Sequence, residues 1–111
     1  MNETRIIEGN QLIHEFLGFE RTEKDNGEVT YKTSEKDVVL WASKLEYDSS
    51  ILWLWRALQK WDNLYEEIDP KNGSMYVELS DKLDNTVVCY EVNLIWEQMI
   101  ENIKWYNKQK L

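Results

Sequence analysis

The sequence predicts one α+β domain over residues 1–111, built from three helices and two β-hairpins in the order α-ββ-α-ββ-α. Three observations support this prediction. Apolar residues recur at helical spacing in three segments, they alternate with polar residues in short runs between those segments, and turn-forming residues separate the runs. We expect the helices to pack on a mainly antiparallel four-stranded sheet, with an α/β/α sandwich as one form that this packing can take.

The first helix is predicted over residues 3–17, followed by Gly18, which favours the left-handed conformation found after helix ends. Gly9 and Asn10 lie on its apolar face. We expect the amide of Asn10 to hydrogen-bond a neighbouring backbone group, because a buried amide without a partner costs about 1–3 kcal/mol. Gly9 has no side chain and would let another element approach the helix closely.

The first hairpin is predicted directly after this helix. Residues 28–33 alternate between apolar and polar side chains, as a half-buried strand does, and Val38–Ala42 is a more uniformly apolar run. The segments Asn26-Gly27 and Ser34–Asp37 supply the turns that bound these two strands.

The central helix is predicted to begin after Asp48-Ser49-Ser50, any of which can cap it, and to end at about Glu67. Its apolar residues occupy about 200° of the helical wheel, whereas a surface helix needs only about 100°. Leu52 is the one apolar residue in the remaining polar sector. A helix of this kind must contact more than one β-sheet, so we expect another helix or a partner protein to cover it.

The second hairpin is predicted between the central helix and the last one. Met75–Leu79 alternates like a strand, residues 80–85 form a polar loop, and Thr86–Val92 is rich in β-branched residues. The last helix is predicted to start near Asn93 and to continue almost to the end of the chain, with one apolar stripe along its length.

The chain carries 21 acidic and 13 basic residues, a net charge of −8. Because no basic face is available to contact phosphates, we do not expect nucleic-acid binding. The longest apolar runs fall far short of the ~20 residues that a membrane span needs, and the first ten residues lack the pattern of a secretory signal peptide. With a single cysteine, which excludes an internal disulfide, these features predict a cytoplasmic protein that contacts neither nucleic acid nor membrane.

The residues show no catalytic constellation, so we expect neither enzyme activity nor a metal or cofactor. His14 is the only histidine and lies at the border of the first helix's apolar face, without the further ligands that a zinc site requires. Cys89 falls in a predicted strand, where a free cysteine usually acts as a small buried apolar residue. Asp81 and Asp84 share the predicted polar loop, but it lacks the spacing and the glycine of a calcium-binding loop.

The tryptophans are the best remaining indication of a functional surface, because there are six of them in 111 residues. Most belong to the apolar stripes of helices. Trp53 and Trp105 lie near the edges of these stripes, and Leu64 falls beside Trp53 on the helical wheel. Since Trp is enriched at the centres of protein interfaces, we expect these three residues either to close a helix–helix contact within the domain or to form an association surface.

Three segments of the chain together resemble a known protein family. Ile6–Glu20 is similar to the pattern IIEGNxLIxEFMGxE, Tyr47–Leu54 to the start of YHSSWDWLMP, and Ile103–Asn107 matches IKWYN. These patterns, in this order, are typical of the phage ABA-sandwich domain family, a group of small proteins encoded by phages and prophages of gut bacteria. The resemblance implies helices on both faces of a central sheet. It implies no biochemical activity, because none is established for the family.

The middle segment departs from the family pattern. Asp48, Ile51, Leu52, Trp55 and Arg56 stand where the pattern has His, Trp, Asp, Met and Pro. A role tied to the family's His, Trp or Asp would therefore not carry over to this chain.

Two functions from different classes fit the sequence. The first is a phage or prophage accessory protein that acts, without catalysis, by binding a host or phage protein. The alternative is a domain that binds a small ligand such as a nucleotide, or a minor enzyme, with a pocket between a helix layer and the sheet near Asn10, Tyr47 and Ser49. A structural component of the virion and a homo-oligomer both stay open.

Overall fold

The computed structural model describes residues 2–33, 39–68 and 70–109. These residues form four α-helices, one three-stranded antiparallel sheet and three short 3₁₀ helices. The helices are α1 (Glu3–Phe16), α2 (Ile51–Asn63), α3 (Gly73–Val88) and α4 (Val92–Gln109); the strands are β1 (Arg21–Glu23), β2 (Val29–Lys32) and β3 (Val39–Trp41); the 3₁₀ helices are η1 (Ala42–Lys44), η2 (Leu64–Glu67) and η3 (Pro70–Asn72).

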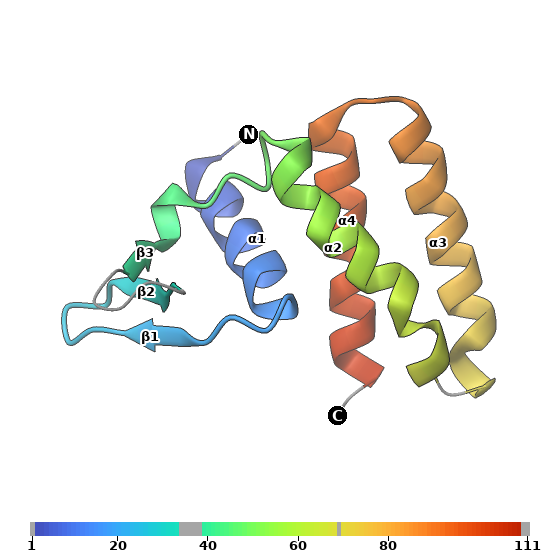
Figure 1. The fold of residues 1–111 in the computed structure, drawn as a ribbon, viewed down its shortest axis with the longest axis horizontal. Coiled ribbons are helices and arrows are strands. Elements are labelled where there is room, and N and C mark those ends of the chain that lie inside the picture. The colour runs from blue at the N-terminus through green and yellow to red at the C-terminus, as the bar shows by residue number, and fades with distance from the viewer. Residues whose placement is uncertain (1, 34–38, 69, 110–111) are drawn as a thin grey trace.

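α2, α3 and α4 lie side by side as a helical bundle, and α1 lies between this bundle and the small sheet (Figure 1). The sheet projects away from the bundle. The radius of gyration, 14.7 Å, accordingly exceeds the ~13 Å typical of a compact chain of this length. None of the helices in the described part of the chain is long and apolar enough to cross a membrane.

The prediction of a second hairpin, and with it the four-stranded sheet and the α/β/α sandwich, is wrong. The segment Gly73–Val88 is a single helix, and the described residues form only the sheet β1-β2-β3. The strand-like alternation of Met75–Leu79 coexists with a helical spacing, in which Tyr76, Leu79 and Leu83 are buried. The segment forms a helix and not a strand because its contacts with α4 bury the apolar residues that recur at helical spacing.

Three further predictions fail with the second hairpin. Asp81 and Asp84 lie on exposed positions of α3 and not in a loop. Thr86 is β-branched but is accommodated in the helix, since its hydroxyl donates to the carbonyl of Leu83 at 2.7 Å. Cys89 caps the end of α3 and is exposed, so it is neither a strand residue nor buried.

The sheet confirms the predicted strands only in part. β2 and β3 occupy the predicted first hairpin, with Tyr31 opposite Leu40, and Gly27 makes a turn with a φ of 85°. That turn connects β2 to β1 (Arg21–Glu23), which was not predicted because its three residues are exposed and lack alternation. The predicted turn at Ser34–Asp37 and the residue Val38 lie outside the described residues.

α2 is confirmed as a helix with more than one packing partner. It contacts α4, and its buried Trp61 reaches α3 by donating from Nε1 to Ser80 Oγ at 2.9 Å. Tyr76 of α3 stacks on the ring of Trp61 and donates to the Trp61 carbonyl at 2.6 Å. The broad apolar arc therefore reflects helices on several sides and not a layer of sheet.

α1 and α4 meet at Gly9, Asn10 and Trp96, which we call the α1–α4 seam. A Cβ atom on Gly9 would lie 2.3 Å from the Trp96 ring, so only glycine permits this approach. Trp96 Nε1 donates to Asn10 Oδ1 at 2.8 Å, and Asn10 Nδ2 donates to the Leu45 carbonyl at 3.0 Å and to Asp48 Oδ1 at 2.8 Å. Both predictions for these residues are confirmed: the glycine admits a neighbour, and the amide bonds a backbone group.

Candidate functional site

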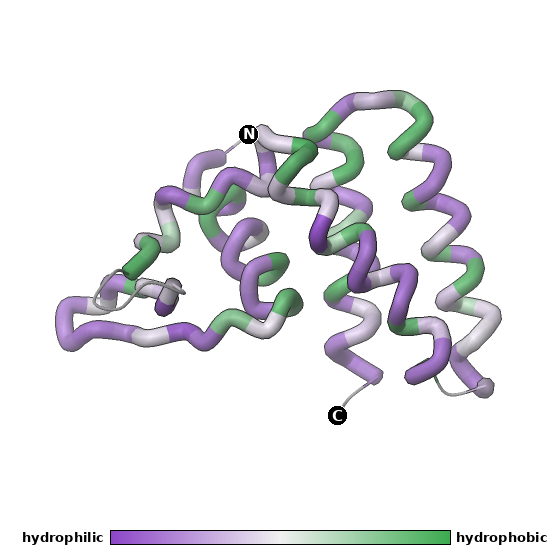
Figure 2. Tube along the Cα trace, viewed as in Figure 1, coloured by the Kyte–Doolittle hydropathy of each residue, from purple (hydrophilic) through white to green (hydrophobic). Residues whose placement is uncertain are grey.

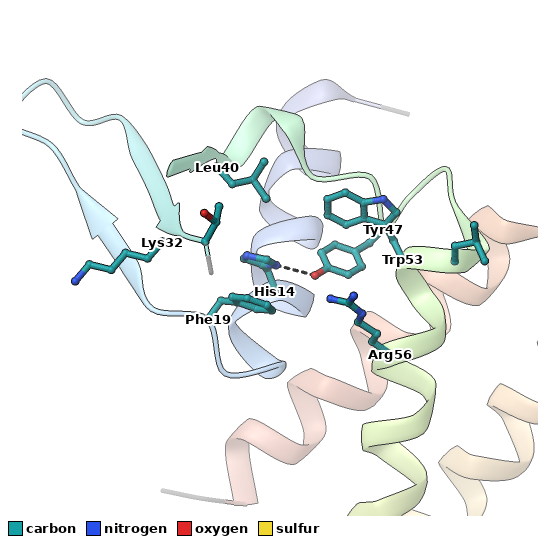
Figure 3. Close-up of a pocket in the computed structure, with 9 residues that line it drawn as sticks. His14, Phe19, Lys32, Leu40, Tyr47, Trp53 and Arg56 are labelled. Atoms are coloured by element: carbon teal, nitrogen blue, oxygen red, sulfur yellow. Dashed lines mark hydrogen bonds between the residues drawn. The ribbon is translucent and has the colours of Figure 1, made fainter. Parts of the chain in front are cut away.

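A cavity of about 570 Å³ opens between the end of α1, the β2–β3 edge of the sheet and the start of α2 (Figure 3). We call it the pocket. Its size falls within the range of about 300–1,000 Å³ that is usual for small-molecule sites. The residues that line it are His14, Phe19, Lys32, Thr33, Leu40, Tyr47, Leu52, Trp53 and Arg56.

The end of α1 builds one wall of the pocket from local sequence. Gly18, with a φ of 97°, follows the helix, and the N–H groups of Gly18 and Phe19 donate to the carbonyls of Glu15 and His14. This pair of bonds is the Schellman motif, which brings the second residue after a helix back over its last turn. Phe19 consequently stacks on the His14 ring, with centroids 4.0 Å apart and planes 2° from parallel.

His14 and Tyr47 form a polar pair among these rings. His14 Nδ1 lies 2.7 Å from the Tyr47 hydroxyl, and both side chains are buried. Burial lowers the pKa of His14 to about 4, because a charged imidazole would lose its hydration there. Burial also raises the pKa of Tyr47 to about 12, against the opposing effect of the Arg56 charge. Both side chains are therefore uncharged near neutral pH.

Tyr31 supports the pair from the sheet. Its ring meets the His14 ring edge-on at 4.6 Å, and its hydroxyl donates to Glu15 Oε2 at 2.9 Å. Burial, followed by the hydrogen bond and charge of Glu15, raises the pKa of Tyr31. Tyr31, Phe19 and Tyr47 thus contact the imidazole from three sides and hold it in one orientation.

The start of α2 forms the opposite wall. Trp53 is half-buried, and its ring meets Tyr47 edge-on at a centroid distance of 5.1 Å. Arg56 follows three residues later and therefore shares a helix face with Trp53. Figure 3 shows its guanidinium directed toward the Tyr47 hydroxyl. Leu52, which is 80% exposed, lies at the rim.

The charged side chains among the described residues that line the pocket are of one sign. Among the described residues that line it, Lys32 and Arg56 are cationic and none is a carboxylate. Neither cation forms an ion pair with a described carboxylate, since the three pairs in this part of the chain involve Arg5, Arg21 and Lys82. In Figure 3 the ammonium group of Lys32 points away from the His14–Tyr47 pair, so Arg56 is the cation that faces it.

The structure separates the residues predicted to line a pocket. Tyr47 lies in the pocket as predicted. Asn10 is buried in the α1–α4 seam, and its amide bonds Leu45, Asp48 and Trp96. Ser49 is exposed, with its hydroxyl 3.5 Å from the Glu46 carbonyl. Neither Asn10 nor Ser49 is among the residues that line the cavity.

The structure also separates Trp53, Leu64 and Trp105. Leu64 is buried in the core and lies 11 residues beyond Trp53, about 16 Å along a helical rise of 1.5 Å per residue. Trp105 is half-buried and packs edge-on against Trp61 at 6.3 Å. These three residues do not form one surface: Leu64 and Trp105 contribute to internal contacts, and Trp53 lines the pocket.

Phe19, Leu52 and Arg56 were not predicted from the sequence as site residues. One signal for them was present, because Leu52 is apolar in the polar sector of α2, one turn from Arg56. His14 was named in the sequence only as a histidine without the further ligands of a zinc site, and the structure bonds it to Tyr47. The described residues contain no group of three His, Cys, Asp or Glu side chains that could hold a metal ion.

Comparison of the chain with protein-family models, with curated proteins and with solved structures finds no match. The resemblance to the phage ABA-sandwich domain family therefore stays a prediction.

Proposed function

We propose that this protein is a non-catalytic binding domain and that the pocket takes a small ligand with an apolar, ring-shaped part. The observation that supports the proposal most is the wall of aromatic rings, in which Phe19 is held in place by His14 and Trp53 by Tyr47. Pre-organised side chains lose little entropy when a ligand binds, so such a wall favours binding.

The acid–base properties of the pocket favour binding over catalysis. A general acid or base works best when its pKa lies near the working pH. Burial moves the pKa of His14 down to about 4 and that of Tyr47 up to about 12, away from neutrality in both directions. Their hydrogen bond consequently serves to position the rings and to offer polar atoms to a ligand.

An uncharged aromatic probe tests this proposal. N-phenyl-1-naphthylamine fluoresces more strongly in apolar surroundings, so its titration reports binding to the pocket. We expect saturable binding to the wild-type protein and about a tenfold loss of affinity in Trp53→Ala, since an aromatic contact contributes about 0.5–1.5 kcal/mol beyond the burial of its surface.

Trp55→Ala is the matched control, because Trp55 lies on the same helix, is 55% exposed and does not line the pocket. Equal affinities for wild type and Trp53→Ala, or no binding to either, would contradict the proposed function.

A second candidate is the predicted role in binding a host or phage protein, as an accessory protein of a phage or prophage. The observation that favours it is an apolar end of the bundle, where the start of α2 and the α3–α4 connection both lie (Figure 2). Leu52, Val88 and Tyr90 at this end are 80%, 73% and 88% exposed. Tyr90 also has a φ of 56°, which is unfavourable for a residue with a side chain.

Substitution of this apolar end tests the second candidate. Wild type and a Val88→Ser/Tyr90→Ser variant would each be used to capture proteins from a bacterial lysate. We expect a binding partner to be retained by wild type and lost with the variant. A partner that both forms capture equally well would show that another surface binds it.

A further inference from the structure

We propose that the ligand of the pocket is a planar aromatic compound with an anionic group, a carboxylate or a phosphate, which Arg56 binds. The inference rests on the proposed function, since it states which chemical class of ligand the same pocket takes. Three properties of the site support it: the sign of its charges, the orientation of the α2 helix and the chemistry of its walls.

The charges are the first support. The whole chain has a net charge of −8, yet the described lining of the pocket holds Lys32 and Arg56 and no carboxylate. Glu15 and Asp48, which each follow a lining residue in the sequence, accept hydrogen bonds from Tyr31 and Asn10. An arginine without a carboxylate partner keeps its planar fork of donors available, and this fork fits carboxylates and phosphates.

The direction of α2 is the second support. Its first turn carries Leu52 and Trp53 and borders the pocket, and this end of a helix bears a partial positive charge. Ser50 occupies the N-cap position, but its side chain makes no capping hydrogen bond. The helix end and Arg56, which lies just over one turn into the helix, therefore favour an anion on the same side of the pocket.

The walls are the third support. Phe19, Tyr47 and Trp53 present ring surfaces, and Leu40 and Leu52 add aliphatic ones. Flat aromatic groups pack well on such surfaces. Aromatic rings also attract cations, but a cationic ligand would meet the Arg56 guanidinium without a described carboxylate in the lining to balance its charge. A ligand that combines a ring with an anion matches all of these features.

A matched pair of probes separates the charge from the ring. 1-Anilinonaphthalene-8-sulfonate has the rings of N-phenyl-1-naphthylamine and adds one anionic group. We expect wild type to bind the sulfonate about tenfold more tightly than the uncharged probe, as a hydrogen bond to a charged group allows. In Arg56→Gln we expect this preference to disappear, so that the two probes bind with similar affinities.

Arg5→Gln is the control for a general loss of positive charge. Arg5 is an exposed arginine on α1 that pairs with Glu97 and does not line the pocket. This variant should keep the wild-type preference for the sulfonate. The result that would overturn the inference is equal affinity of wild type for both probes, or a preference that survives in Arg56→Gln.

The uncharged probe distinguishes a failure of this inference from a failure of the proposed function. If the uncharged probe binds and its affinity depends on Trp53, the pocket binds aromatic ligands and only the proposed preference for an anion is wrong. If the uncharged probe does not bind, the proposed function itself is wrong. Competition by 2-naphthoate and by 1-naphthyl phosphate then identifies the anionic group. We expect at least one of them to displace the sulfonate probe from wild type, and displacement by neither would overturn the inference.

Discussion

α1 makes two contacts that differ in how completely they are filled. At the α1–α4 seam, the Trp96 ring lies against Gly9, and the buried polar atoms of Asn10 and Trp96 are paired. The groove beside this seam has a volume of only about 180 Å³. At its other end α1 faces the sheet and α2 through His14, where a cavity of about 570 Å³ remains.

The difference follows from the residues at each contact. Glycine and a small amide permit two helix backbones to approach, so side chains from α4 fill the space. Around His14 the rings of Phe19, Tyr31 and Tyr47 each contact the imidazole and hold the neighbouring elements apart. We conclude that the filled contact contributes mainly to stability, whereas the open contact is available for a ligand.

Asn10→Leu should have the largest effect on the filled contact. The substitution leaves the indole N–H of Trp96 and the carbonyl of Leu45 buried without partners, at about 1–3 kcal/mol each. We expect the free energy of unfolding to fall by about 4 kcal/mol in urea denaturation. In a double-mutant cycle, Trp96→Phe should remove one of these penalties, so strictly additive effects would contradict the role assigned to the bond.

Gly9→Ala should come next. The new methyl group would lie 2.3 Å from the Trp96 ring, which is fully buried and held by Asn10. Overpacking of this kind should cost about 3 kcal/mol despite the better helix propensity of alanine. Gly73→Ala is the control, because no atom lies within 4 Å of its added methyl group and α3 should be unchanged or slightly stabilised. A neutral Gly9→Ala would show that the seam is less tightly packed.

The open contact around His14 should make the free energy of unfolding depend on pH. The pKa of His14 is about 4 in the folded protein and 6.5 in the unfolded chain, so the unfolded chain binds more protons between these values. The free energy of unfolding should therefore fall as the pH drops from about 6.5 to about 4, by up to about 3 kcal/mol from this residue.

An NMR titration measures this directly, because His14 is the only histidine. Its imidazole should titrate near pH 4, and a midpoint near 6.5 would contradict its burial. The loss of stability in this range should be smaller in His14→Gln, while the carboxylates affect both proteins alike.

Leu52→Gln should have the smallest effect on stability. Leu52 borders the pocket but is 80% exposed, so its substitution should change the free energy of unfolding by no more than about 0.5 kcal/mol. The same urea denaturation measures it. A loss as large as that of Gly9→Ala would mean that the rim of the pocket belongs to the core, and the contrast between the two contacts would no longer hold.

Prediction from the sequence succeeded for elements with long and unambiguous patterns. α1 and α4 lie close to their predicted ranges, α2 ends at Asn63 with the 3₁₀ helix η2 continuing to the predicted end at Glu67, and the apolar stripe of α4 is buried. It failed for Gly73–Val88, where short apolar runs fit a strand and a helix alike. It also missed the short strand Arg21–Glu23, whose pairing depends on a partner strand and not on its own residues.

The residues of the site could be predicted from the sequence only in part. Tyr47 was expected in a pocket between helices and sheet, and it lies there. Asn10 was expected beside it but serves the α1–α4 seam, because its amide can satisfy three partners only where α4 and the Leu45–Asp48 segment converge. Trp53 was expected near Leu64, and the helical wheel brought them together only because it omits distance along the axis.

The sequence by itself determined the local features: the periods of three helices and the stop at Gly18 after the first of them. These depend on residues within a turn or two of each other, whose spacing the chain carries. The tertiary structure alone decided that α3 is a helix and that His14, Tyr47 and Arg56 share one pocket. The physical reason is that burial is a property of pairs of elements, and elements distant in the sequence meet only after the chain has folded.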